Sequence, residues 1–485
     1  MSADADPRPL QVVARAPGAT PASPRGRSPA SWLALLPASA LAACLIDNPR
    51  WQAPAAGSSG ASEDGGSDSG GLEPSPGCDA LPPAPADAVA LTPDDAATLP
   101  DRIESAAPDT TFVLAPGVYV LPRGLTITAA GVTLRGVGDD PTAVWLDGAG
   151  GSFDLVRIAA DDVTIAELGL RATAGSLVVV EPSTSSITGT RLHRLVLRDA
   201  AAAQLRVDAD ASAGFFADDG EVACSDFGLG DAFRAEQVAA CNVGAISMTA
   251  TADWVVRDNL VQGFWCAEHN ALPAVRVGFG ARGTQIERNL FVDDWRPLVV
   301  GDSGPPDGSA DGCLDATPPL RPFDDAQCGA QYWGHIGGGV RNNRVWTGGP
   351  GIATLANVDS GISMWCVCGG DVVHNTVVAT LAVLSSIEYR YARSRLRLAN
   401  NLVTHAIWAR DPAAVQLGQS NATDVSLNLF VAALEPPPQL DLHLRVDATA
   451  ARDVGVVLPA PAVLDDFELQ PRDARPDYGA DEYVP

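Results

Sequence analysis

Five carboxylates occur close together in one stretch of the chain: Asp293, Asp294, Asp302, Asp307 and Asp311. Carboxylate oxygens are hard ligands of the kind that Ca²⁺ prefers. The stretch contains no EF-hand loop and no nonapeptide calcium repeat, so a solvated acidic loop is the alternative interpretation. We treat Asp302, Asp307 and Asp311 as candidate calcium ligands and candidate catalytic residues. Calcium is the candidate cofactor for this stretch.

Arginine supplies all 32 basic side chains, which excludes mechanisms that need a lysine base or Schiff base. Four arginines lie in the sequence EYRYARSRLRL, and alternation along a strand would direct Arg395 and Arg397 to one outer face. Such a row could bind a uronate carboxylate in a bidentate manner, or could neutralise neighbouring acidic side chains. We favour neutralisation, and keep Arg395 and Arg397 as candidate catalytic residues.

Three tryptophans stand at similar positions of a repeated sequence. Trp265 and Trp295 each follow an asparagine by six residues, and Trp408 follows another by seven. As an exposed row, the three indoles would form a platform for sugar rings; turned inward, they would fill wide corners, which is the commoner role of a repeated aromatic residue. They are the candidate carbohydrate-binding residues.

The N-terminal region has the features of an export signal. Arg25 and Arg27 precede an apolar stretch from Trp32 to Ala43, which is too short to span a bilayer as a helix. This stretch ends in LAAC, which resembles the bacterial lipoprotein cleavage box, where the cysteine becomes the lipidated first residue. The resemblance implies a signal peptide over residues 1–43 and a lipid anchor at Cys44, which would be the only attachment to a membrane.

Eight cysteines remain after Cys44, and an even number in an exported chain favours disulfides. Cys224 with Cys241, and Cys313 with Cys328, are the local pairs that the spacing suggests, each closing an irregular insertion. A zinc site built from other cysteines and nearby histidines is the alternative, but their spacing matches no compact zinc motif.

The sequence argues against a dinucleotide site, a serine protease and polyanionic partners. GFGARG, residues 278–283, continues into another strand-like run where a dinucleotide site needs a helix. GDSG, residues 301–304, lacks the histidine segment of a serine protease. A formal net charge of −27 makes nucleic acid and anionic membrane surfaces poor partners.

The elements that position these residues are short and β-rich. Residues 44–89 form a tether dominated by Ser, Gly, Pro and Asp, and structure begins near residue 90. A short helix is predicted from Leu99 to Ala106, followed by strands of four or five residues broken by Pro and Gly. The absence of long amphipathic helices from the sequence excludes a doubly wound α/β fold.

A repeat decides the architecture. An asparagine beside a pair of apolar residues recurs at intervals of 30, 54, 32, 26 and 27 residues: Asn259, Asn289, Asn343, Asn375, Asn401 and Asn428. A second apolar strand begins 13 or 14 positions earlier in the copies, at Ile246, Val275, Ile362, Ile387 and Val415. Two coupled short strands per period predict the coils of a parallel β-helix. We expect the asparagines to occupy left-handed corners and to stack with hydrogen bonds between coils.

At these residues the chain resembles the right-handed parallel β-helix, or pectin-lyase-like, superfamily. The segments LAPGVYVLPRGLTITAAGVTLRGVG and RPDYGADEY resemble the family's first coil and its closing segment. The resemblance implies an all-β, single-stranded right-handed parallel β-helix with an N-terminal capping helix and irregular insertions. The parallel β-helix would occupy residues 90–434, and the closing segment would occupy residues 435–485.

The superfamily includes polysaccharide lyases, pectin hydrolases and adhesins, so the fold leaves the activity open. The first hypothesis is a periplasmic or surface-exposed, lipid-anchored monomer that binds polysaccharide or another envelope component. A calcium-assisted lyase acting on acidic glycans is the enzymatic alternative, in which an arginine would act as the base. A structural surface protein or adhesin is the third hypothesis.

Overall fold

The computed structural model describes residues 78–210, 212–236, 241–267, 271–301, 313, 321, 334–355, 357–411, 415–416, 418, 420–459 and 463–484. All of them fall within one compact unit of the chain, Arg50–Pro485. Cys44, Cys328, Asp302, Asp307 and Asp311 lie outside the described residues, as does the whole predicted signal peptide.

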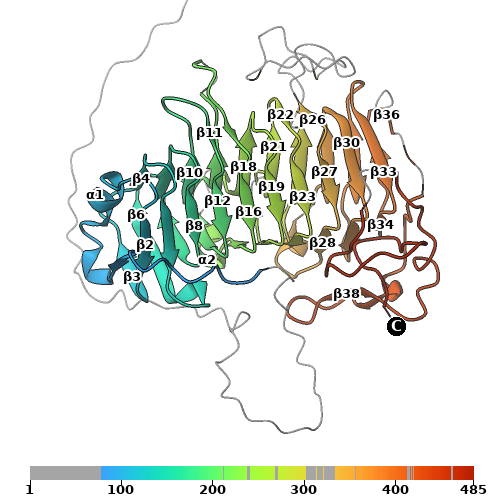
Figure 1. Ribbon diagram of the computed structural model, residues 1–485. Coiled ribbons are helices and arrows are strands. Elements are labelled where there is room, and N and C mark those ends of the chain that lie inside the picture. Colours follow the sequence, from blue (N-terminus) through green and yellow to red (C-terminus); the bar gives the residue numbers. More distant parts are fainter. Residues whose placement is uncertain are drawn as a thin grey trace, which may run out of the picture. The chain divides into compact units, whose positions relative to one another are not determined.

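Most of the described strands belong to three long sheets, named A, B and C (Figure 1). Sheet A consists of β1 (Val89–Leu91), β2 (Thr111–Leu114), β5 (Thr133–Gly136), β8 (Thr164–Ala166), β12 (Arg191–His193), β16 (Glu221–Ala223), β19 (Val255–Arg257), β22 (Ala281–Arg282), β23 (Gln285–Glu287), β26 (His335–Ile336), β27 (Gly339–Arg341), β30 (Val367–Val373), β33 (Arg395–Ala399) and β36 (Val415–Gln416). Sheet B consists of β3 (Gly117–Val120), β6 (Val144–Gly151), β9 (Gly169–Thr173), β13 (Val196–Ala200), β17 (Asp226–Gly228), β20 (Leu260–Gln262), β24 (Leu290–Val292), β28 (Arg344–Thr347), β31 (Thr376–Ala379) and β34 (Leu402–Val403). Sheet C consists of β4 (Leu125–Ile127), β7 (Val156–Ile158), β10 (Val178–Val180), β14 (Ala203–Val207), β18 (Gly244–Thr249), β21 (Val275–Gly278), β25 (Leu298–Gly301), β29 (Ile362–Trp365), β32 (Ile387–Arg390) and β35 (Ile407–Ala409).

The remaining elements are short. Two α-helices and four 3-10 helices are described: α1 (Leu99–Glu104), α2 (Asp231–Glu236), η1 (Pro93–Asp95), η2 (Pro141–Ala143), η3 (Ile352–Thr354) and η4 (Leu427–Leu429). Two small strand pairs complete the described chain, one parallel and one antiparallel: β11 (Ile187–Thr188) with β15 (Ala217–Asp218), and β37 (Phe430–Ala432) with β38 (Asp441–Leu444). Within the described ranges, no helix is long and apolar enough to cross a bilayer.

A typical coil contributes one strand to sheet C, one to sheet A and one to sheet B in turn, and two of the described coils add a second short strand, β22 or β26, to sheet A. For example, β18, β19 and β20 form one coil, and β21, β23 and β24 form the next. Successive coils pair in parallel and in register, as Ile246 with Val275 and Val275 with Leu298. The predicted parallel β-helix is therefore confirmed. Equivalent residues of adjacent coils lie about 4.8 Å apart, so like positions form columns.

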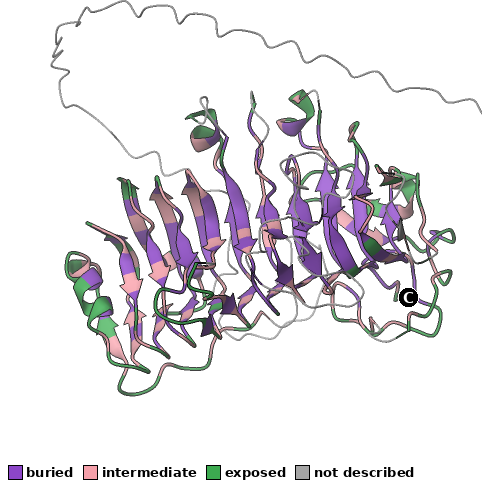
Figure 2. Ribbon diagram, turned by 90° about the horizontal axis from the view of Figure 1, so that it is seen from above, coloured by how far each residue is buried: buried purple, intermediate pink, exposed green. Residues whose placement is uncertain are grey.

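The core fills the space that the three sheets enclose, and Figure 2 shows that buried residues continue along the strands of the stack. One column of sheet C illustrates the pattern, because each member is fully buried: Ile246, Val275, Leu298, Ile362 and Ile387. Helix α1 adjoins the first coils and adds the buried side chains of Leu99 and Ile103 to the same core. It ends at Glu104, two residues before the predicted end.

The predicted asparagine column is present at the corners between sheets A and B. Five of its members are buried and adjacent: Asn259, Asn289, Asn343, Asn375 and Asn401. The Nδ2 of each donates to the Oδ1 of the next at 2.9 to 3.0 Å. The backbone N–H of each donates to the same oxygen at 3.0 to 3.1 Å. These side-chain amides provide hydrogen-bond partners for backbone groups at the corners, where the chain is not paired in a sheet.

Two details of the predicted column are wrong. The residues with left-handed backbone precede the asparagines, and their φ angles lie between 52° and 57°: Asp258, Arg288, Asn342, His374 and Asn400. The column also ends on Asn421, because the last coil brings that residue, 20 positions after Asn401, under its Nδ2 at 2.8 Å. Asn428 is exposed in η4. Val415, predicted as the matching strand of Asn428, pairs in sheet A with Arg395.

The predicted disulfide partners are also wrong. Cys224 bonds Cys78 instead of Cys241, and Cys241 bonds Cys266. Cys313 bonds Cys366 instead of Cys328. The winding brings together Cys241 with Cys266 and Cys313 with Cys366, whereas Cys78 belongs to a segment that passes along the outside of coils far from it in sequence. Cys368 is disulfide-bonded as well.

The C-terminal part of the chain packs on the outer face of sheet B. Trp346 and Val378 point away from the core there, and Phe430, Leu442 and Leu444 bury them in a second apolar cluster. The Trp346 Nε1 donates to the Ala433 carbonyl at 2.8 Å. This apolar cluster holds the closing part of the chain against sheet B.

We predict that Asn375→Ala lowers the free energy of unfolding by about 2–4 kcal/mol, because it leaves the Asn343 N–H and the Val340 carbonyl without their buried partner. Asn428→Ala is the matched control, and we expect a change below about 0.5 kcal/mol because this side chain is exposed. Chemical denaturation measures both values. Equal losses in the two variants would contradict the structural role of the column.

We predict that the double variant Cys78→Ser, Cys224→Ser releases the segment that precedes β1. The Cys78–Cys224 bond joins residues 146 positions apart, and native disulfides commonly contribute about 2–4 kcal/mol. Hydrogen exchange should therefore accelerate at residues 78–85, with little change at the asparagine column. Unchanged exchange at residues 78–85 would show that other contacts alone hold the segment.

Candidate functional site

Aromatic and charged side chains gather on the outer face of sheet C, towards its C-terminal coils. In β29 and β32 the core takes Ile362, Met364, Ile387 and Tyr389, so the alternate residues face outward. The register aligns Ser363, Glu388 and Trp408 in one outward row, and Trp365 with Arg390 in the next. We name the group formed by Trp295, Arg296, Asp359, Trp365, Glu388, Arg390, Trp408, Arg410 and Asp411 the aromatic–arginine cluster.

Arg296 joins two indoles of this cluster. Its guanidinium carbon lies 4.6 Å from the ring centre of Trp295 and 4.9 Å from that of Trp365. Its Nε donates to the Asp359 Oδ2 at 2.8 Å, and the Trp295 Nε1 donates to the Asn357 carbonyl at 2.7 Å. A guanidinium held between two rings and a carboxylate fixes the orientation of both rings.

Glu388 provides the buried carboxylate of the cluster. It is completely buried, and it accepts a hydrogen bond from the Trp365 Nε1 at 2.6 Å and one from Arg410 at 3.3 Å. These partners compensate the cost of burying its charge. Glu388 therefore anchors the ring of Trp365 and the guanidinium of Arg410.

Trp408 is the most open aromatic side chain of the cluster, with 40% of its surface exposed. Trp295 and Trp365 keep only 7% and 6%. Arg410 lies 5.8 Å from the Trp408 ring centre, and Arg390 bonds Asp411 at 3.2 Å. The cluster thus offers one exposed indole beside Arg410, and both Arg390 and Arg410 are held by acidic partners.

Of the three predicted tryptophans, the structure brings Trp295 and Trp408 to this face but not Trp265. Trp265 follows β20 at another corner, where it packs against the core and lies 4.3 Å beneath the guanidinium carbon of Arg234. The three residues therefore do not form one exposed row. Trp295 fills a corner, which was the alternative interpretation, and Trp408 alone retains an open ring.

The two arginines singled out in the sequence lie on a different sheet. Arg395 and Arg397 both face outward from β33 of sheet A, as alternation predicted. Arg397 bonds Asp371 at 2.8 Å and the Pro459 carbonyl at 3.1 Å, which agrees with neutralisation. Arg395 is exposed. Neither residue belongs to the aromatic–arginine cluster.

The acidic stretch divides into a described and an undescribed part. Asp293 accepts the N–H groups of Gly348 and Gly349, each at 2.9 Å, and Asp294 accepts that of Phe264 at 2.9 Å. Both carboxyl groups thus bind the backbone of neighbouring coils. Because Asp302, Asp307 and Asp311 are not described, their role as calcium ligands or catalytic groups stays a prediction.

A second group of metal-binding residue types is held by ion pairs. His443, Glu468 and Asp481 place their ligand atoms within 4.8 Å of one another. Arg344 bonds Glu468 at 2.5 Å, and hydrogen bonds to Asp441 and Glu468 raise the pKa of His443 to about 10. A guanidinium and a protonated imidazole supply the positive charge there, so the group is a closing contact of the C-terminal part.

Sequence reasoning missed Arg296, Asp359, Trp365, Glu388 and Arg410. The signal for Trp365 was present, since it lies three positions after Ile362, the first buried residue of its strand, and must face outward by alternation. Arg296, Asp359, Glu388 and Arg410 could not be found in this way. Their proximity depends on the paths of the corners between strands, which the repeat does not define.

Comparison with known proteins gives only remote structural likenesses. No family model and no curated protein matches the chain. Its fold is similar to that of the alginate lyase from Paenibacillus sp. str. FPU-7, at 11% identity over 70% of this chain and 99% of that chain, with a TM-score of 0.41. It is also similar to PfbA, a surface adhesin of Streptococcus pneumoniae, at 11% identity over 69% and 91% of the two chains, with a TM-score of 0.36. Pectate lyase Pel9A matches at 11% identity over 79% and 90%, with a TM-score of 0.29. At these values the likeness carries no argument about activity.

We predict that Asp294→Asn makes the protein's stability less dependent on pH. Complete burial raises the pKa of Asp294 well above its ordinary value of 3.8. As pH rises through 3.8, the unfolded chain loses this proton while the folded chain keeps it, so stability falls. Asparagine keeps an acceptor for the Phe264 N–H and carries no charge.

Unfolding followed between about pH 4 and pH 7 measures the effect. Asp447→Asn is a control of opposite sign, because hydrogen bonds and the charge of Arg445 lower the pKa of that exposed carboxyl group. If the Asp294→Asn and wild-type curves run parallel, Asp294 is ionised in the folded protein.

Proposed function

We propose that the chain is an exported, lipid-anchored protein of the cell envelope that binds polysaccharide at the aromatic–arginine cluster. The observation that carries the proposal is the exposed Trp408 indole beside Arg410, on the face of a parallel sheet. A sugar ring can place its C–H groups on an indole, while guanidinium groups bind its oxygens or a carboxylate. The cluster has both parts.

The arrangement also limits where a ligand can bind. Trp408 belongs to the outward row that begins with Ser363 and Glu388, and this row runs from coil to coil. Because Ser363 and Glu388 are buried, a polysaccharide would contact this row at Trp408, in the last strand of sheet C. Because hydrogen bonds and ion pairs already fix Trp365, Arg390 and Arg410, little side-chain entropy would be lost on binding.

Export is supported by the disulfides. Three complete bonds occur among the described residues, and such bonds persist in oxidising compartments. This agrees with the LAAC sequence at Leu41 to Cys44, on which the lipid anchor rests. Incorporation of labelled palmitate into the wild type, and its absence from Cys44→Ala, would test that anchor.

We predict that Trp408→Ala weakens binding of the preferred polysaccharide about tenfold or more, through loss of the stacking surface. A glycan array with the wild-type protein would identify the ligand, and calorimetry would then compare the variants. Trp145→Ala is the matched control, because Trp145 lies outward on sheet B beneath Arg171 at 4.9 Å, away from the cluster. Equal affinity of Trp408→Ala and wild type would contradict this site.

The enzymatic alternative is a calcium-assisted lyase that acts on acidic glycans. The same set of glycans distinguishes it from a binding protein. A lyase acting on polyuronates in Ca²⁺ would produce an absorbing unsaturated sugar. Binding without such a product supports the binding protein, whereas a calcium-dependent product that Asp302, Asp307 or Asp311 variants lose supports the lyase. Binding to host or cell surfaces without glycan binding would favour the adhesin.

A further inference from the structure

We propose that a second site, on the outer face of sheet A, binds a carboxylate-bearing oligosaccharide with Arg191 as the residue that contacts the carboxylate. This site lies between the sheet and residues 78–85, which we name the strap. It shares no residue with the aromatic–arginine cluster, so the proposal does not depend on the function assigned to that cluster.

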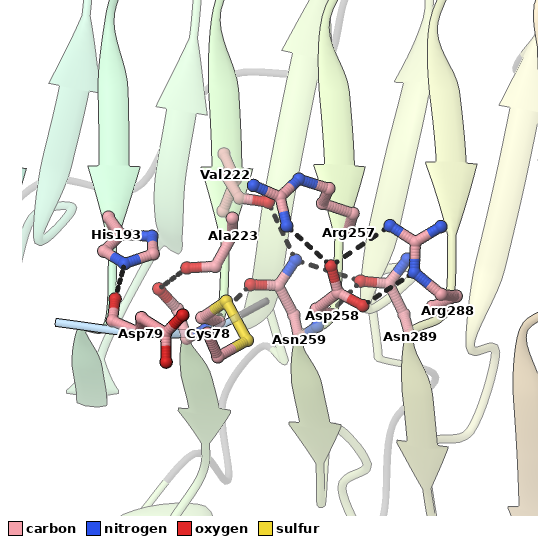
Figure 3. The surroundings of a disulfide bond; sticks show 12 residues. Cys78, Asp79, His193, Val222, Ala223, Arg257, Asp258, Asn259, Arg288 and Asn289 are labelled. Carbon is pink, nitrogen blue, oxygen red and sulfur yellow. Dashed lines mark hydrogen bonds and ion pairs between the residues drawn. A yellow bond between two sulfur atoms is a disulfide. The ribbon is translucent and has the colours of Figure 1, made fainter. Parts of the chain in front are cut away.

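The strap falls within the predicted tether, residues 44–89, but it is fixed to the sheet at several coils. Cys78 bonds Cys224, and the Asp79 carbonyl accepts a hydrogen bond from the His193 Nε2 at 2.9 Å (Figure 3). Further along, the Leu81 N–H donates to a Glu167 oxygen at 2.7 Å. Arg135 donates to the Pro82 carbonyl at 2.5 Å and to the Leu81 carbonyl at 3.3 Å. A wall held at four coils is a rigid side for a groove.

The groove between strap and sheet has a volume of about 430 Å³, within the usual range for ligand sites. Its floor includes a row of polar side chains that the strand register aligns across adjacent coils: Thr111, Thr133, Thr164, Arg191 and Glu221. The strap contributes proline rings to the other side. The groove therefore follows the direction in which the coils stack.

Arg191 is the cation of this groove that is open to a ligand. Arg135 is bound by Glu167 at 2.9 Å, and Arg257 is bound by Glu221 and Asp258, each at 2.7 Å. The Arg191 side chain is exposed and forms no ion pair within the described ranges. Glu221, its neighbour in the row, already binds Arg257, and Asp79, the other described acidic residue that lines the groove, forms no ion pair with Arg191, so an anionic ligand would be the partner of Arg191.

The threonine row and the strap favour an oligosaccharide over a peptide. The hydroxyl groups of Thr111, Thr133 and Thr164 can each donate and accept, as sugar hydroxyls require. A peptide would need free backbone groups to add a strand. The strap offers few, because Pro82, Pro83 and Pro85 have no N–H and the Leu81 N–H is already bound.

Arg191→Gln tests the site, with Arg445→Gln as a control of equal charge change at an exposed arginine paired with Asp447. Calorimetry at low salt would compare oligogalacturonate with the same oligosaccharide after reduction of its carboxyl groups. We expect the wild type and Arg445→Gln to bind the carboxylated form, and Arg191→Gln to bind it about tenfold more weakly. The reduced form should bind weakly to all three, and added salt should weaken the wild-type complex.

Thr164→Tyr provides a second variant, since its ring would fill the groove without changing the charge. It should weaken binding as Arg191→Gln does, whereas Trp408→Ala should leave this binding unchanged. Three results would overturn the proposal: equal affinity for the reduced and carboxylated forms, no effect of Arg191→Gln, or binding of poly-glutamate in preference to the oligosaccharide. Loss of binding in Trp408→Ala but not Arg191→Gln would place acidic glycans at the other site alone.

Discussion

The rest of the structure depends on the exact superposition of successive coils. Every strand of the three long sheets forms hydrogen bonds with the strand one coil before or after it, and a slip of one residue would turn its core side chains outward. The asparagine column adds a second constraint at the corner between sheets A and B. Each amide there binds both the side chain and the backbone of its neighbour, so the corners cannot shift independently of the strands.

This superposition gives the outer faces their functional potential. A side chain that faces outward lies beside its equivalents in neighbouring coils, so single residues from separate repeats combine into rows. On sheet C the rows bring Trp365, Glu388 and Trp408 together, and on sheet A they align threonines with Arg191. On sheet C only Trp408 of its row is open to a ligand, whereas on sheet A an extended ligand could follow the row from coil to coil.

Electrostatic pairing decides which outer side chains are available. The chain is strongly acidic and its cations are all arginine, so most described guanidinium groups lie against one or two carboxylates. Asp258, for example, binds both Arg257 and Arg288 (Figure 3). Several such ion pairs join arginines and carboxylates of neighbouring coils on the outer faces of the sheets. A position where the pairing is incomplete, such as Arg191, is therefore more informative than the number of arginines.

The sequence by itself determined the period, the alternation of inward and outward residues and the amide column, and these were enough to define the coil stack. Asn259 to Asn401, and Ile246 to Ile387 on sheet C, lie where the repeat placed them, because each depends on spacing within one coil. The tertiary structure alone decided how coils of unequal length meet. It replaced Asn428 by Asn421, gave Cys224 the partner Cys78, and separated Trp265 from Trp408. Those outcomes depend on the paths of corners and insertions, which are not periodic, and on a segment that returns along the outside of coils far from it in sequence.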